Sequence, residues 1–113
     1  MKAKTLVEIL ERDVIEGNLA LYRNLLDTTN EATDPVWKAI LPLYINFSKD
    51  EKDAFLNFLK VVEINSVSHV LGLLDGTIYA DGIEEDFILT TEGSNEIINE
   101  NLQDLFIELV EEE

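Results

Sequence analysis

Residues 48–76 read SKDEKDAFLNFLKVVEINSVSHVLGLLDG, and this stretch holds the clearest helical pattern of the first half of the chain. Ser48 and Glu51 have the spacing of a capping box, in which each residue's side chain bonds the other's backbone N–H at a helix start. Apolar residues then recur with the helical period at Phe55, Phe58, Leu59 and Val62. We therefore expect an amphipathic helix that begins after Ser48.

The pattern changes near Ile64, where polar residues interrupt the apolar repeat. Asn65 or Ser66 can cap a new helix, which would carry Val67, Val70, Leu71 and Leu74 and end at Asp75 and Gly76. Because this segment has almost no charge, we expect it to be the most buried helix of the fold.

Outward toward the N-terminus, three more helices are predicted. Thr5 and Glu8 have capping-box spacing, and Gly17 is placed to stop the helix that they begin. Asn18 can cap a second helix, which would form a short-linked antiparallel pair with the first. Asp34 followed by Pro35 predicts the start of a third helix, with Trp37, Ile40, Leu41 and Tyr44 on its buried side.

Proline at position 42 lies inside the predicted third helix. An interior proline removes a hydrogen bond and costs roughly 3 kcal/mol, so we expect a kink or an early end there.

Outward toward the C-terminus, residues 76–82 are bounded by glycines and predict a loop. Residues 87–91 favour β-structure and a turn follows at residues 92–95, which predicts one small β-hairpin near residues 87–98. Asn99 or Asn101 can cap a last helix, with an apolar face of Leu102, Leu105, Phe106, Leu109 and Val110. The expected fold is thus a single α+β domain over residues 1–113, predominantly α, with five or six helices and one hairpin.

The charge of the chain is divided unevenly between its halves. Residues 1–60 hold all eight basic residues and ten acidic ones, a net charge of −2, whereas residues 61–113 hold fourteen acidic residues and no Lys or Arg, a net charge of −14. A charge asymmetry of this kind bears on partners rather than on fold. It argues against direct binding to nucleic acid or anionic lipid. Without an apolar span or signal core, the expected location is the cytoplasm.

The acidic half is the candidate site, and a basic protein is the partner that it would suit. Tyr79 lies in the acidic loop and could anchor such a partner, although a local packing role is the alternative. The acidic surface could also be only a solubilising one. The candidate partner-binding residues are Asp75, Tyr79, Asp81, Glu84, Glu85, Asp86, Glu100, Asp104 and Glu108.

Catalysis has weaker support in the sequence. The chain has no Cys and lacks the common nucleophile and phosphate-loop motifs, so we predict no enzyme activity, no cofactor and no metal. His69 is the only histidine, and a structural role is the commoner one for a lone residue of this type. The cluster from Asp81 to Asp86 could gather a cation, but its spacing does not fit the twelve-residue calcium loop.

Three segments carry a resemblance: SVSHVLGLLDG (66–76), FILTT (87–91) and NLQDLFIELVEE (101–112). They resemble small acidic bacterial proteins, some of which are similar to the immunity partners of polymorphic toxins. The resemblance implies a cytosolic binding protein that neutralises a toxin by occluding it and has no catalytic residues. The charge of the acidic half adds the expectation that such a toxin is basic, as a nuclease-type toxin would be. The alternatives are a DNA mimic, which would fill the nucleic-acid channel of another protein, and a small enzyme or cation-binding domain that uses His69 or the acidic cluster.

Overall fold

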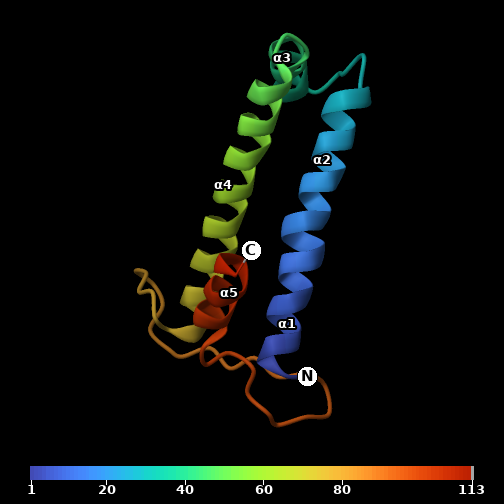
Figure 1. The fold of residues 1–113 in the computed structure, drawn as a ribbon. Coiled ribbons are helices and arrows are strands. Elements are labelled where there is room, and N and C mark those ends of the chain that lie inside the picture. The colour runs from blue at the N-terminus through green and yellow to red at the C-terminus, as the bar shows by residue number, and fades with distance from the viewer. Residues whose placement is uncertain (113) are drawn as a thin grey trace.

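The helix α4 (Lys49–Asp75) runs through almost the whole of the stretch quoted above without a break (Figure 1). It is seen in a computed structural model that describes residues 1–112. The predicted capping box is confirmed: the Glu51 N–H donates to Ser48 Oγ at 3.1 Å, and the Ser48 N–H donates to Glu51 Oε1 at 2.8 Å. The predicted break near Ile64 is wrong. Ser66 continues the helix and donates its hydroxyl to the Val62 carbonyl.

The second half of α4 is also less buried than expected. His69 and Val70 are exposed, and Val70 keeps 53% of its surface accessible. None of the helices that the structure describes, α4 included, combines the length and the apolar character needed to cross a membrane.

A second long helical rod lies beside α4 and is made of three consecutive elements, α1 (Ala3–Ile9), the π-helical stretch η1 (Leu10–Glu16) and α2 (Gly17–Thr28) (Figure 1). The predicted stop at Gly17 is wrong, because this residue has helical φ −63° and lies exposed within the rod. A glycine inside a helix costs only about 1 kcal/mol, which tertiary packing can offset. The predicted cap at Thr5 is also wrong, since the helix already begins at Ala3.

The third helix, α3 (Pro35–Ile45), closes one end of the two rods (Figure 1). Its predicted start is confirmed, because Asp34 Oδ1 accepts the Val36 N–H at 2.9 Å and the Trp37 N–H at 3.2 Å. The helix continues three residues past Pro42, so the early end does not occur.

The core at the α3 end consists of Leu26, Tyr44 and Leu56, with partly buried aromatic and aliphatic residues around them. Tyr44 is 2% exposed, and its hydroxyl donates to Asp27 Oδ1 at 2.7 Å. Burial and this hydrogen bond raise the pKa of Tyr44 to about 12.

A separate core lies at the other end of the rods, where α5 (Leu102–Glu111) packs against α1 and α4. Its apolar face is the predicted one, and its buried cluster is Val7, Ile15, Leu71, Ile98, Leu102 and Phe106. The predicted asparagine cap is wrong: Asn101 makes no capping bond, and Asp75 Oδ2 instead accepts the Gln103 N–H at 2.8 Å. The end of α4 therefore caps the start of α5.

The predicted hairpin near residues 87–98 is absent. Residues 1–112 form four helical rods and contain no strand, so the expected α+β fold with five or six helices is wrong and the described chain is all-helical. One backbone bond joins the two arms of the predicted hairpin, from the Ile98 N–H to the Leu89 carbonyl at 2.8 Å.

Hydrogen bonds of the buried Asn99 side chain hold this segment in the absence of the backbone hydrogen bonds of a β-sheet. Its Nδ2 donates to the carbonyls of Leu74 (2.6 Å) and Phe87 (2.8 Å), and its Oδ1 accepts the Leu89 N–H (2.6 Å). Asn99 therefore holds the segment between α4 and α5 against the end of α4.

Candidate partner-binding surface

The acidic loop, residues 75–86, contains two glycines at which the chain turns after the end of α4. Gly76 has φ 80° and Gly82 has φ 97°, and both values lie in the left-handed region that favours glycine. The N–H groups of Thr77 and Ile78 donate to the Gly72 carbonyl, which ends the helix. The side chains of Ile78 and Gln103 then pack so closely on Gly72 that a Cβ at this position would force them to shift.

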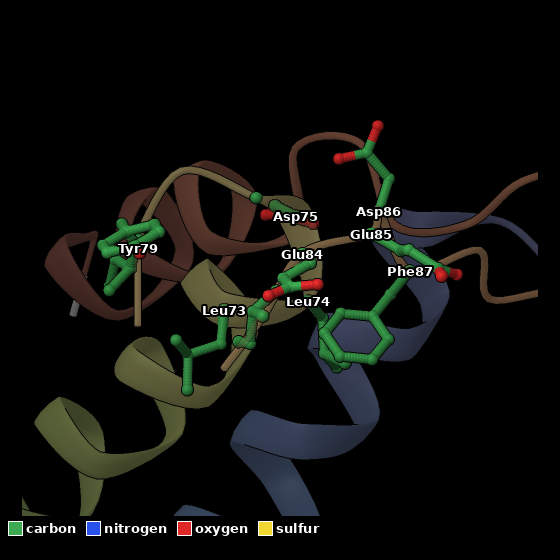
Figure 2. A pocket seen from close by; sticks show the side chains of 11 residues that line it. Leu73, Leu74, Asp75, Tyr79, Glu84, Glu85, Asp86 and Phe87 are labelled. Atoms are coloured by element: carbon green, nitrogen blue, oxygen red, sulfur yellow. The ribbon is translucent and has the colours of Figure 1, made fainter. Parts of the chain in front are cut away.

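A shallow pocket of about 170 Å³ lies between this loop and the last turn of α4. Figure 2 shows the side chains around it. The apolar part of its lining is formed by Leu73, Leu74, Ile78, Ile83 and Phe87, and the acidic part by Asp75, Glu84, Glu85 and Asp86. Glu84, Glu85 and Asp86 are exposed, and in Figure 2 Asp86 points away from the pocket. The pocket is thus an apolar hollow with carboxylates at its edge.

Tyr79 also lines the pocket and is the most exposed large apolar residue of the described chain, with 79% of its surface accessible. Its hydroxyl donates to Asp81 Oδ1 at 3.3 Å. In Figure 2 the Tyr79 ring lies at the far side of the pocket from Phe87. An aromatic ring that is this accessible beside carboxylates can pack against a cationic side chain.

Asp75 differs from the other predicted site residues because the fold uses its carboxylate. Oδ2 caps α5, and Oδ1 is buried with no hydrogen-bond partner among the described residues. The side chain therefore faces the junction of α4 and α5, and its role in the fold is clearer than a role toward a partner.

The remaining predicted acids lie on α5 or, in the case of Glu100, just before it, on a different part of the surface. Glu100, Asp104 and Glu108 are all exposed, as the sequence predicts. Glu108 lines a second cleft, between α5 and α1, together with Lys4 and Glu8. The predicted acidic residues are thus divided between the loop and α5, and they do not all line one pocket.

Counter-charge is scarce throughout the acidic half. Of its fourteen acidic residues, thirteen are described, and among these only Glu96 forms an ion pair, with Lys2 Nζ at 2.9 Å. The hydrogen bond from Lys2 lowers the pKa of the Glu96 carboxyl. The remaining twelve described carboxylates have no cationic side chain within 4.0 Å.

The alternative sites find little geometric support. His69 lies on the exposed side of α4, and no hydrogen bond or ion pair joins it to another described residue. Within residues 1–112, no group of three or more His, Asp or Glu side chains is arranged to hold a metal ion, and this includes the acids from Asp81 to Asp86.

Two features of the surface were not foreseen in the sequence. One is the apolar side of the pocket, where Phe87 approaches the end of α4 from a segment that was predicted to be a strand. The other is the role of Asn99, which was predicted only as a possible cap of the last helix and instead holds the segment between α4 and α5 through its side chain.

Comparisons with protein-family models, with curated proteins and with solved structures find no match to this chain.

Proposed function

We propose that this chain is a non-enzymatic acidic protein that binds a basic protein through its acidic loop, residues 75–86. The supporting observation is the combination at one place of an apolar hollow, the accessible Tyr79 ring and the unpaired carboxylates of Glu84, Glu85 and Asp86. Protein interfaces commonly have this composition, with an aromatic anchor inside a polar rim. A nuclease-type toxin is a suitable partner, because its active site must attract phosphate and is therefore basic.

A basic protein fits this surface better than the DNA-mimic alternative does. A mimic needs a long, regular array of carboxylates that follows the phosphates of a duplex. Here the acids are divided between a folded loop and α5. The loop also surrounds apolar side chains, which do not imitate the phosphates of DNA.

The first experiment captures a partner on the immobilised chain from native lysate and measures its binding by stopped flow. Replacing Glu84 and Glu85 together by Gln should slow association several-fold at low salt, because rim charges act on the encounter of the two proteins. A matched control removes the same charge at the α3 end, with Glu31→Gln and Asp50→Asn. Equal slowing by the control pair would contradict the assignment to the loop.

The second experiment tests whether the Tyr79 ring anchors the bound partner, whereas the first tests whether the carboxylates speed its approach. Tyr79→Ala should speed dissociation of the captured partner, whereas Tyr79→Phe, which keeps the ring, should leave dissociation nearly unchanged. Competition by duplex DNA tests whether this chain covers the nucleic-acid surface of the captured partner, since DNA then displaces the partner from this chain. Unchanged dissociation in Tyr79→Ala would remove Tyr79 from the site.

A further inference from the structure

A second pocket lies at the α3 end of the rods, at the opposite end of the molecule from the acidic loop (Figure 1). Its volume is about 280 Å³, compared with about 170 Å³ for the pocket of the acidic loop. Three helices line it: α2 with Asp27, α3 with Leu41, Pro42 and Ile45, and α4 with Lys52. A hollow in which apolar side chains meet a few polar groups is the usual form of a small-molecule site.

The Lys52 ammonium provides the positive end of this pocket. Its Nζ lies 5.0 Å from the centre of the Tyr44 ring, and no described carboxylate lies within 4.0 Å of it. The face of an aromatic ring attracts a cation but does not neutralise its charge. The ammonium is therefore available to a carboxylate of a ligand, which it would bind by a charge-assisted hydrogen bond.

The Asp27 carboxylate provides the negative end. Its Oδ1 accepts the hydroxyl of Tyr44 at 2.7 Å, whereas no described residue donates to its Oδ2. Burial and this hydrogen bond raise the pKa of Tyr44 to about 12, so the phenol keeps its proton at neutral pH and holds the carboxylate in place. One carboxylate oxygen is thus fixed by the fold, and the other is open to an ammonium group of a ligand.

The two charged groups are close to each other without forming an ion pair. Lys52 contacts the face of the Tyr44 ring and Asp27 contacts its hydroxyl, so the gap between them is about the length of one phenol and its two contacts. An α-amino acid carries an ammonium and a carboxylate on a single carbon. With a hydrogen bond of about 2.8 Å at each end, it has the length to bridge a gap of this order.

Charge disfavours other simple ligands. An anion would meet Asp27 and the net charge of −16, and a cation would meet Lys52. A zwitterion has no net charge and satisfies both groups. The α3 wall adds a preference for an apolar side chain, and Pro42 belongs to this wall although a proline inside a helix is costly to the fold.

We propose that this pocket binds a free α-amino acid with an apolar side chain. The ligand carboxylate pairs with Lys52, its ammonium pairs with Asp27, and its side chain packs on the α3 wall. The inference does not depend on the function proposed above, because the two pockets lie at opposite ends of the rods. The ligand has few non-hydrogen atoms, so we expect a dissociation constant between the micromolar and the millimolar range.

Isothermal titration calorimetry of the whole chain tests the ligand class. The probes are L-leucine, L-isoleucine, L-valine, L-methionine and L-phenylalanine, each up to about 10 mM, and at least one should bind saturably with a stoichiometry near one. The N-acetyl and amide derivatives of the tightest of these probes keep its side chain but each lose one charge. Both should bind about tenfold more weakly or worse. Saturation by none of the five, or equal binding of either derivative, would overturn the proposal.

Two variants test the residues. Lys52→Gln and Asp27→Asn should each weaken binding of the same probe by about tenfold or more, and Asp27→Asn keeps an oxygen that accepts the Tyr44 hydroxyl. The control is Lys49→Gln, which removes the same charge at an exposed residue of α4 outside the pocket and should leave binding unchanged. Unchanged binding in Lys52→Gln, or an equal loss in the control, would contradict the assignment. Circular dichroism checks the fold of each variant, and the derivatives test the same contacts in the unchanged chain.

Discussion

Replacing Asn99 should destabilise the protein more than its place in a loop suggests. Its side chain makes three hydrogen bonds of 2.6, 2.8 and 2.6 Å, and the residue is 5% exposed. A hydrogen bond contributes about 0.5–1.5 kcal/mol net, so Asn99→Ala should lower the free energy of unfolding by about 2–4 kcal/mol. Against a total of roughly 5–15 kcal/mol for a domain, this loss is large.

Asn99→Asp sharpens the test because it keeps the shape of the side chain. The introduced carboxylate could still accept the Leu89 N–H, but it would face the carbonyl oxygens of Leu74 and Phe87 where the amide donated to them. This repulsion and burial should raise the pKa of the new carboxyl in the folded state. A raised folded pKa favours folding at low pH and disfavours it as the pH rises, so the variant should be closer to the parent at pH 4 than at pH 7.

The assay is urea unfolding followed by circular dichroism, with proteolysis of residues 76–98 as a local measure. Asn95→Ala is the matched control, because Asn95 is exposed in the same segment and its side chain makes no hydrogen bond to a described residue. A loss below about 1 kcal/mol in Asn99→Ala, or an equal loss in the control, would refute the role given to Asn99.

Three further predictions concern the helices. Burial, followed by the nearby Glu16 charge, raises the pKa of the Glu63 carboxyl. Glu63→Gln should therefore stabilise the fold at pH 7 and lose this advantage as the pH falls below the folded pKa. Thermal melts at pH 7 and pH 4 measure the difference. Asp75→Ala should cost about 1 kcal/mol in urea unfolding because it removes the cap of α5, whereas Asn101→Ala, which removes no capping bond, should cost much less. Gly72→Ala should destabilise the fold by about 1–3 kcal/mol through its clash with Ile78. Gly17→Ala should instead stabilise the fold by about 0.5–1 kcal/mol. A higher melting temperature for Gly72→Ala than for Gly17→Ala would contradict the packing described.

Two helix starts predicted from a local signal are confirmed, whereas the capping box predicted at Thr5 does not form because the helix already begins at Ala3. The Ser48 box and the Asp34–Pro35 start depend only on side chains within three residues of the helix start, and both are confirmed. Helix stops were predicted less well. Gly17 and the polar residues near Ile64 are weak breakers, and packing between two long rods outweighs a cost of about 1 kcal/mol at either place.

The segment between α4 and α5 depends on contacts that are remote in sequence. Residues 87–91 have β-favouring side chains, but β-propensity requires a neighbouring strand to take effect. In the structure the backbone at Phe87 and Leu89 bonds the Asn99 side chain. The acidity of the candidate surface could be predicted by counting residues, whereas its apolar hollow could not, because Phe87 and Leu74 are brought together only by this fold.

The two separate cores imply that the molecule contains two cooperative units. One buried cluster lies at the α3 end and the other lies around α5, and between them the ion pairs of Lys60 with Glu16 and of Arg23 with Asp53 join the two rods. Native proteins open in local units whose stability follows their buried contacts. Amide hydrogen exchange should therefore protect the two ends to different extents. We therefore expect the α3 end to open without unfolding the loop that we propose as the binding surface.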